Sequence, residues 1–411
     1  MSLEARQFLE NLQRQDYEQN DTPHWLKKEK GALINEQLEA LLKLRQTIQQ
    51  DIASPEEYGA FWQILFPGQS GIEKVPAHQL EALSDASFAR KLEQLARAPL
   101  PTRLEDPFTY SVFSLVYPFL ERGFRHFGYQ PDAITVGTRP HPEVNAQVFR
   151  IPESQSYLIA LQEGLVAFLF KAARVFNKFT TPPHQFFDTW SMRPEIEQNH
   201  ILPPQSKIKL DATADFIDIL QVFLFGRSDE YDDHLFAPKD ISISLNINTT
   251  LTLPMYTFVF AHEYAHVFLN HQLGEKDWQK ETEADLKALQ MALIAFKDNE
   301  KAFPVLNAVA LYFELIEILE MAKSVMITGE PYRMRSDSHP YPKIRKAALF
   351  NALAEQLKTD PVDYKMAAFS QQVTSQFAIE MWLKIHPKLQ EWKAAGLQMK
   401  SFLNLQKISS L

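Results

Sequence analysis

The sequence predicts an α+β protein that is predominantly helical, with a small sheet and one central helix that carries a cluster of ionisable residues. Apolar residues recur at three- and four-residue spacing through most of the chain, which is typical of helices packed around a core. Short β-rich runs gather between residues 133 and 161. With 411 residues, of which 45% are hydrophobic and 23% charged, the chain is long enough for two or three structural units.

Residues 1–130 are expected to form an accessory helical region. Helical spacing is clearest in NEQLEALLKLRQTIQQDI and SFARKLEQLARA, and the breaks between helices fall at FPGQSG and APLPTRLEDP. No residue pattern in this region indicates a chemical function, so its expected role is structural.

A second unit is expected over residues 131–350, with an insertion at about 177–240. It begins with three β-rich runs, AITVG, AQVFRI and SYLIAL, and the last leads into an apolar helix from about Gln162 to Phe176. The insertion is rich in proline and aromatic residues and contains one helical segment, ADFIDILQVFLFG. DISISLNIN then alternates apolar and polar residues, which predicts a half-buried strand.

Helices are expected through the remainder of the chain. The first runs from about Pro254 to His271, with Pro254 in its first turn, and a second begins near Asp277. A third helix is indicated by NAVALYFELIEILEMAKSVM. Residues 351–411 are expected to form a C-terminal helical region, in which FAIEMWLKIHPKLQEWKAA is amphipathic.

Composition and charge argue against several classes of partner and site. A formal net charge of −9, without a concentrated face of lysine and arginine, argues against nucleic-acid binding. The absence of cysteine excludes disulfides and cysteine-based zinc sites, so a bound metal would need histidine, aspartate or glutamate. The amino terminus is polar, and the longest apolar runs are short or interrupted by ionisable residues. We therefore expect a soluble, cytoplasmic protein without an integral membrane segment.

The apolar run FVFAHEYAHVFLNH contains three of the chain's 12 histidines and a glutamate, and burying such groups is costly unless they have partners. His262 and His266 are four residues apart, so on a helix both imidazoles can face one metal ion. Glu263 is displaced around the helix and can reach a water on that ion without binding the ion itself. The alternative is that both histidines are core residues hydrogen-bonded to carbonyl groups.

The segment ETEAD, which begins 15 residues after His266, contains a candidate third ligand. A catalytic zinc needs three protein ligands and one open position, and Glu281 is the expected third, delivered by an antiparallel second helix. Asp285, one turn later, is placed to hold the far nitrogen of a ligating histidine. The alternative is a solvated acidic start to a helix, which the helix dipole favours, and Glu283 fits that alternative.

These residues give the chain a resemblance to a known family. HExxH followed by ExxxD is the pattern of the gluzincin metallopeptidases, and Asn145–Leu169 resembles a signature of the group that contains the HtpX heat-shock protease and the CAAX prenyl endopeptidases. His271 stands where that group often has a further histidine, and SHPYPKIRKAAL is similar to its downstream His-Pro…Arg segment. The matches cover about residues 145–170, 255–290 and 336–350. The resemblance implies a zincin-like catalytic unit, with an edge strand beside the cleft in the Asn145–Leu169 segment.

Carried over residue by residue, the resemblance makes His262, His266 and Glu281 the ligands of one zinc ion. It makes Glu263 the general base of the reaction. Asp285 becomes the carboxylate that orients a ligating histidine.

The same resemblance places His339 or Arg345 near the cleft, where either side chain could stabilise an oxyanion, and His339 would then be catalytic. The alternative for His339 is a turn residue before proline, and the alternative for Arg345 is a structural role. His271 is expected to cap or pack at the end of its helix.

The chain departs from that group in two ways: it has no transmembrane helices, and about 90 residues separate the Gly164-Leu165 helix from the HExxH motif. The resulting hypothesis is a zinc-dependent endopeptidase that hydrolyses peptide bonds in a protein or peptide substrate through a zinc-activated water. DISISLNIN or the strand near Tyr157 would bind the substrate backbone as an added strand. The alternatives are a non-catalytic, partner-binding or regulatory protein on the same scaffold, and manganese or cobalt in place of zinc.

Overall fold

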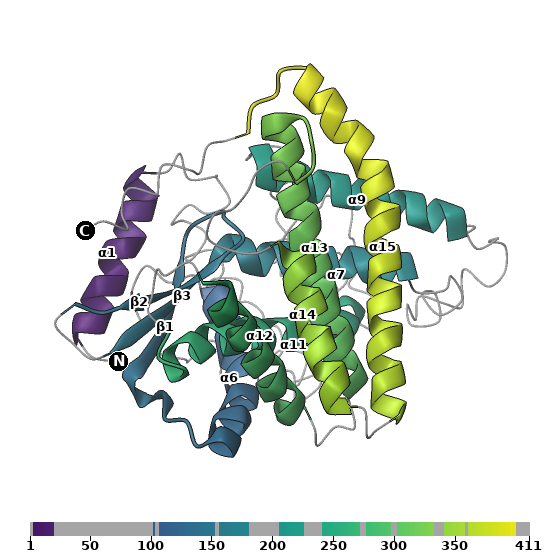
Figure 1. Ribbon diagram of the computed structural model, residues 1–411. Helices are drawn as coiled ribbons and strands as arrows, with labels where there is room; N and C mark the ends of the chain where they lie inside the picture. Colours follow the sequence, from purple (N-terminus) through teal and green to yellow (C-terminus); the bar gives the residue numbers. More distant parts are fainter. Residues whose placement is uncertain are drawn as a thin grey trace, which may run out of the picture.

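The computed structural model is predominantly helical with one small sheet, which confirms the predicted α+β class (Figure 1). The structure describes residues 3–19, 102, 107–152, 156–180, 205–225, 241–271, 277–296, 302–332, 341–357 and 361–399. The predicted helices in NEQLEALLKLRQTIQQDI and SFARKLEQLARA lie outside these residues, as does much of the 177–240 insertion. The domain boundaries near residues 130 and 350 stay predictions.

The sheet has three strands, and they coincide with the three β-rich runs of the sequence. They are β1 (Ile134–Arg139), β2 (Ala146–Arg150) and β3 (Tyr157–Gln162), in the spatial order β1-β3-β2. The central strand β3 pairs in parallel with β1 and antiparallel with β2. Because both sides of β3 are paired, the prediction that a substrate strand adds to the strand near Tyr157 is wrong.

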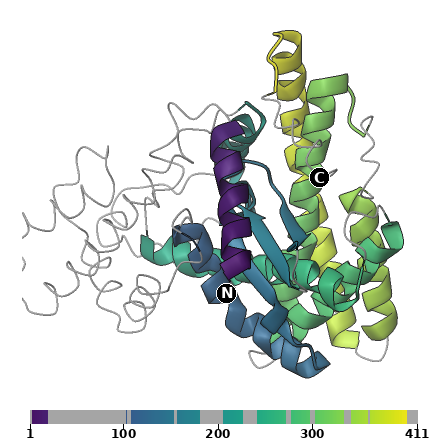
Figure 2. The same cartoon turned by 90° about the vertical axis from the view of Figure 1, so that its left-hand side faces the viewer.

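Alternate residues of β3 face two different cores, as the two-residue period of a strand requires. Leu158 and Ala160 pack in a small cluster with α1 (Leu3–Gln19), which lies across one side of the sheet (Figure 2). Ile159 and Leu161 belong instead to the large core among the helices. A buried ion pair between Arg139 of β1 and Asp16 of α1, with 2.6 Å between Nη2 and Oδ1, also links the helix to the sheet.

The helices after α1 supply most of the large core. They are α6 (Pro107–Phe127), α7 (Glu163–Thr180), α9 (Gln205–Phe225), α11 (Ile241–Phe268), α12 (Trp278–Ala295), α13 (Ala302–Thr328), α14 (Pro342–Leu357) and α15 (Pro361–Ala394). Helix α11 packs against α6, α7, α12 and α13, and this position explains why its sequence is apolar on nearly every face. None of the described helices is long and apolar enough to cross a membrane.

The start of α11 corrects two predictions. DISISLNIN is not a strand, because Ile241–Asn248 form the first turns of α11, and Pro254 lies inside that helix and not in its first turn. A short alternating run does not by itself separate a strand from part of a buried helix. The apolar residues that follow, from Leu251 onwards, continue without a break into the histidine-bearing run. Helix α11 therefore contains both segments.

A close backbone approach requires a glycine at the start of α7. The loop between β1 and β2 passes over this end of the helix, and the N–H of Gly164 donates to the carbonyl of His141 at 3.0 Å. A Cβ atom on Gly164 would lie 2.2 Å from the Pro142 oxygen. Any larger residue would displace this loop, which leads directly into β2.

Candidate metal centre

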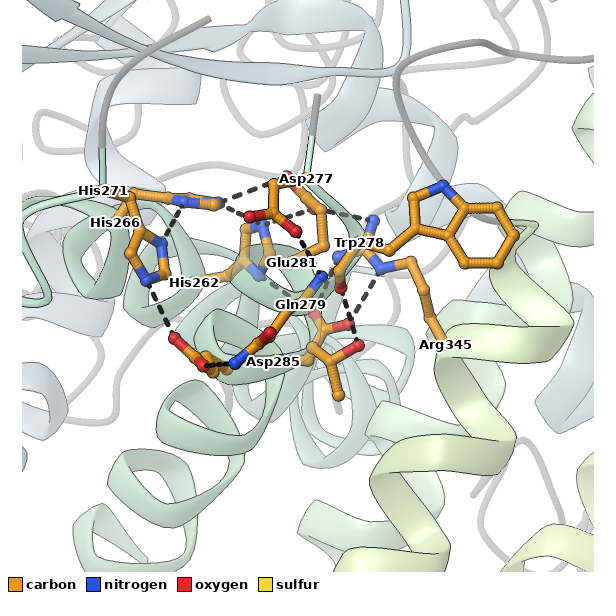
Figure 3. A network of polar contacts seen from close by, with 11 residues as sticks. His262, His266, His271, Asp277, Trp278, Gln279, Glu281, Asp285 and Arg345 are labelled. Carbon is orange, nitrogen blue, oxygen red and sulfur yellow. Dashed lines mark hydrogen bonds and ion pairs between the residues drawn. The ribbon is translucent and has the colours of Figure 1, made fainter. Parts of the chain in front are cut away.

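Two packed helices bring the predicted metal ligands together (Figure 3). His262 and His266 lie one turn apart near the end of α11, as their spacing predicted. Helix α12 begins after Asp277, whose side chain accepts a hydrogen bond from the N–H of Gln279 at 2.9 Å. This cap fixes the start of α12, so that Glu281 in its first turn faces the two imidazoles of α11.

The donor atoms of these three residues lie close to the separations found around one tetrahedral ion. The Nε2 atoms of His262 and His266 are 3.1 Å apart. Nε2 of His262 lies 3.5 Å from Oε2 of Glu281, and Nε2 of His266 lies 3.6 Å from Oε1 of the same carboxylate. Zinc bonds of about 2.0–2.2 Å place tetrahedral ligand atoms about 3.3–3.6 Å from one another. Within the described residues this is the group of histidine and carboxylate side chains that fits a metal ion.

Asp285 determines which nitrogen of His262 faces the site. Its Oδ1 lies 2.9 Å from Nδ1 of His262, on the side of the ring away from Glu281. Burial opposes the ionised form of Asp285, but the charges of Arg345 and His262 prevail and lower its pKa to about 2. An ionised Asp285 accepts the Nδ1 proton of His262, and this directs Nε2 towards the metal position.

The two histidines differ in their affinity for protons. Burial, followed by the charges of His262 and His271, lowers the pKa of His266 to about 2, so its imidazole is neutral and can donate a lone pair. Burial also acts to lower the pKa of His262, but the hydrogen bond and charge of Asp285 outweigh it and raise that pKa. A metal ion would therefore displace a proton from His262, and metal binding should weaken as the pH falls.

Arg345 of α14 holds the carboxylates of α12 in place. Its Nε and Nη2 atoms donate to the two oxygens of Asp285 at 2.8 and 2.7 Å, and its Nη1 atom lies 3.3 Å from Glu281. This two-bond contact is what the structural alternative for Arg345 requires. The other residue predicted near the cleft, His339, lies outside the described residues.

Glu263 lies next to the ligand group but is not part of it. It follows His262 directly on α11, so it is turned by about 100° around the helix. Burial is the largest influence on its carboxyl group and raises its pKa to about 7. The charge of His262 opposes this rise, and that of Glu281 adds to it. A carboxylate with such a pKa can both accept and return a proton near neutral pH.

The raised pKa of Glu263 predicts a pH-dependent cost in stability for the metal-free protein. The unfolded chain loses the Glu263 proton near pH 4.5, whereas the folded chain retains it up to about pH 7. Stability therefore falls as the pH rises through this interval and stays lower above it. Glutamine does not titrate. The free energy of unfolding of the metal-free Glu263→Gln variant, relative to that of the wild type, should therefore be about 2 kcal/mol higher at pH 8 than at pH 5.

Urea unfolding of both chelator-treated proteins at the two pH values measures this difference. Replacing the exposed Glu391 by glutamine is the matched control. The stability of that variant relative to the wild type should be the same at pH 5 and pH 8. A Glu263→Gln protein whose stability relative to the wild type is equal at pH 5 and pH 8 would contradict the burial argument.

Two residues contribute to the site in ways that the sequence did not predict. His271 was expected to cap or pack at the helix end, but its Nδ1 atom lies 3.0 Å from Nδ1 of His266. Glu283 was assigned to the acidic start of a helix, and its Oε2 atom lies 3.4 Å from Nε2 of His271. Asn270 directly precedes His271, and asparagine often ends a helix. This residue could therefore have indicated that the chain turns back here.

Comparison of the chain with protein-family models, with curated proteins and with solved structures finds no match. The candidate metal centre is therefore inferred from this chain's own residues. Three donors converge at suitable distances, and the carboxylate of Asp285 orients one of them.

Proposed function

We propose that this protein is a zinc-dependent endopeptidase of the gluzincin type, which hydrolyses peptide bonds in a protein or peptide substrate. The observation that carries the proposal is the convergence of His262, His266 and Glu281 at separations close to those of tetrahedral zinc ligands, with Glu263 adjacent and outside the ligand group. A structural zinc site uses four protein ligands and has no need of such a glutamate. The resemblance to the HtpX and CAAX endopeptidase group supports the same assignment and a zincin-like catalytic unit.

The roles of the residues follow from their positions. A zinc ion held by His262, His266 and Glu281 would polarise the substrate carbonyl and lower the pKa of the attacking water. Glu263 would accept a proton from that water and pass it to the leaving amine. Asp285 would keep the Nε2 atom of His262 directed at the zinc.

Strand β2 is the proposed place for the substrate backbone. Among the described strands it pairs on one side only, with β3, and it packs against α11, the helix that carries both histidines. An extended peptide could add to its other side through main-chain hydrogen bonds. This position replaces DISISLNIN and the strand near Tyr157, the two places expected from the sequence.

Metal analysis followed by a cleavage screen tests the proposal. The purified protein, supplied with zinc and dialysed, is examined by mass spectrometry and should retain about one zinc per chain, as three protein ligands require. It is then incubated with a complex peptide mixture, in which new chain ends are identified. Cleavage should stop when a chelator removes the metal and return when zinc is added back.

Two results would reject this function. A protein that retains no zinc would leave the three donors without the proposed role. A zinc-loaded protein that cuts neither peptides nor unfolded proteins would instead be a partner-binding or regulatory protein on a zincin-like scaffold.

A further inference from the structure

We propose that His271 and Glu283 form a positioning relay that holds His266 in the tautomer and orientation needed to bind the metal. The inference deepens the proposed function and rests on it, because the relay acts on a ligand of that metal centre. His271 is a positioning residue in this scheme, since its contact is with His266 and the metal position lies on the far side of the His266 ring.

The backbone at the end of α11 places His271 over its last turn. Asn270 adopts a left-handed conformation with φ of 54°, which asparagine tolerates better than most residues. Its N–H donates to the carbonyl of Val267 at 3.1 Å, and the N–H of His271 donates to the carbonyl of His266 at 2.9 Å. This pair of hydrogen bonds is the Schellman arrangement of a helix end. The chain therefore turns back, and the rings of His266 and His271 meet edge to face with 5.1 Å between centroids.

The contact between the two rings has only one arrangement that leaves the metal position accessible. The Nδ1 atoms are 3.0 Å apart, so one of them donates a proton and the other accepts it. If His266 is the donor, its Nε2 atom carries a lone pair and points to the metal position. If His271 were the donor, the neutral His266 would carry its proton on Nε2, facing Nε2 of His262 at 3.1 Å and blocking the metal.

Glu283 selects the favourable arrangement. Its carboxylate lies 3.4 Å from Nε2 of His271, and a carboxylate accepts a proton but does not donate one when ionised. This negative charge favours the His271 tautomer that carries its proton on Nε2, and the Nδ1 atom of that tautomer accepts from His266. The side chain of Glu283 is 48% exposed and that of His271 only 6%. Solvent therefore weakens the contact between Glu283 and His271 more than the contact between His271 and His266.

Both ligating imidazoles are thus supported from α12. His262 is held directly by Asp285, and His266 is held by Glu283 through His271. The same short segment of α12 that supplies the ligand Glu281 also supplies both supporting carboxylates. Loss of such outer contacts typically lowers metal affinity by about 10–100-fold.

A pair of substitutions at His271 tests the relay through metal affinity and not through catalysis. His271→Phe keeps a buried ring of similar size but removes the acceptor, so the zinc dissociation constant should rise about 10–100-fold. His271→Asn can place its amide oxygen close to the position of Nδ1, and it should restore zinc binding to within a few-fold of the wild type. Affinity is measured by competition with a chromogenic chelator, and His126→Phe, at an exposed position on α6, serves as the control.

The visible spectrum of the cobalt-loaded protein provides the second measurement. A changed position of His266 alters the ligand field, so the bands of the His271→Phe protein should shift and those of His271→Asn should match the wild type. If His271→Phe does not fold, as thermal unfolding of the metal-free protein would show, His271→Ala replaces it in the comparison with His271→Asn. Glu283→Gln, at a half-exposed position, should raise the zinc dissociation constant by a smaller factor of a few-fold.

The results separate this inference from the proposed function. Zinc affinity and cobalt bands that are unchanged in His271→Phe would reduce His271 to a helix cap and leave the metal centre intact. A wild-type protein that binds neither zinc nor cobalt would overturn the proposed function and the relay with it.

Discussion

Replacement of Glu263 by glutamine is expected to abolish peptide cleavage while zinc stays bound. The amide has nearly the shape of the carboxylate, but it can neither accept a proton from water nor return one to the leaving amine. Because Glu263 lies outside the ligand group, the zinc content should remain that of the wild type. General acid–base catalysis contributes about 10²–10⁴-fold, so the rate should fall by at least this factor.

The measurement compares initial cleavage rates of zinc-loaded wild type and Glu263→Gln on a peptide identified in the screen, beside the zinc content of each preparation. Glu391→Gln makes the same chemical change at an exposed position of α15 and should retain full activity. A fully zinc-loaded Glu263→Gln protein that cleaves at the wild-type rate would exclude Glu263 as the general base. Loss of zinc from this variant would instead show that Glu263 is a ligand.

Replacement of His266 by alanine is expected to remove zinc binding. Two donors would remain, on His262 and Glu281, and zinc in proteins is normally held by three or four. The loss of affinity should therefore exceed the roughly 10–100-fold that outer contacts contribute. The metal-free variant should fold, because alanine is compatible with the interior of α11.

Thermal unfolding with and without zinc measures this effect without an activity assay. Zinc at 100 times its dissociation constant should stabilise the wild type by about 2.7 kcal/mol, and the same concentration should leave His266→Ala unchanged. His126→Ala, at an exposed position on α6, is the control and should respond to zinc as the wild type does. A zinc-dependent stabilisation of His266→Ala equal to that of the wild type would exclude His266 as a ligand.

The arrangement of the candidate site was largely predictable because its key spacings are local. Residues four apart share one face of a helix, so His262 and His266 were expected to converge, as were Glu281 and Asp285 on the next helix. The contact of Arg345 with Asp285 joins residues 60 positions apart, and no local pattern indicates which partner a distant arginine will select.

The sheet and its surroundings show the same division. The β-rich runs correctly predicted β1, β2 and β3, but they carried no information on spatial order, so the central place of β3 was missed. The alternating DISISLNIN run was misassigned because a strand needs a neighbouring edge, whereas a helix satisfies its own backbone hydrogen bonds.

The sequence by itself determined which residues can lie on one helical face, where the β-rich runs occur, and that any metal must be held by histidine and carboxylate side chains. The tertiary structure decided which helix faces which, and it turned His271 back onto His266. The physical reason is that backbone periodicity acts over a few residues. Contacts between distant side chains depend on how the hydrophobic core assembles, and in this protein that core surrounds α11.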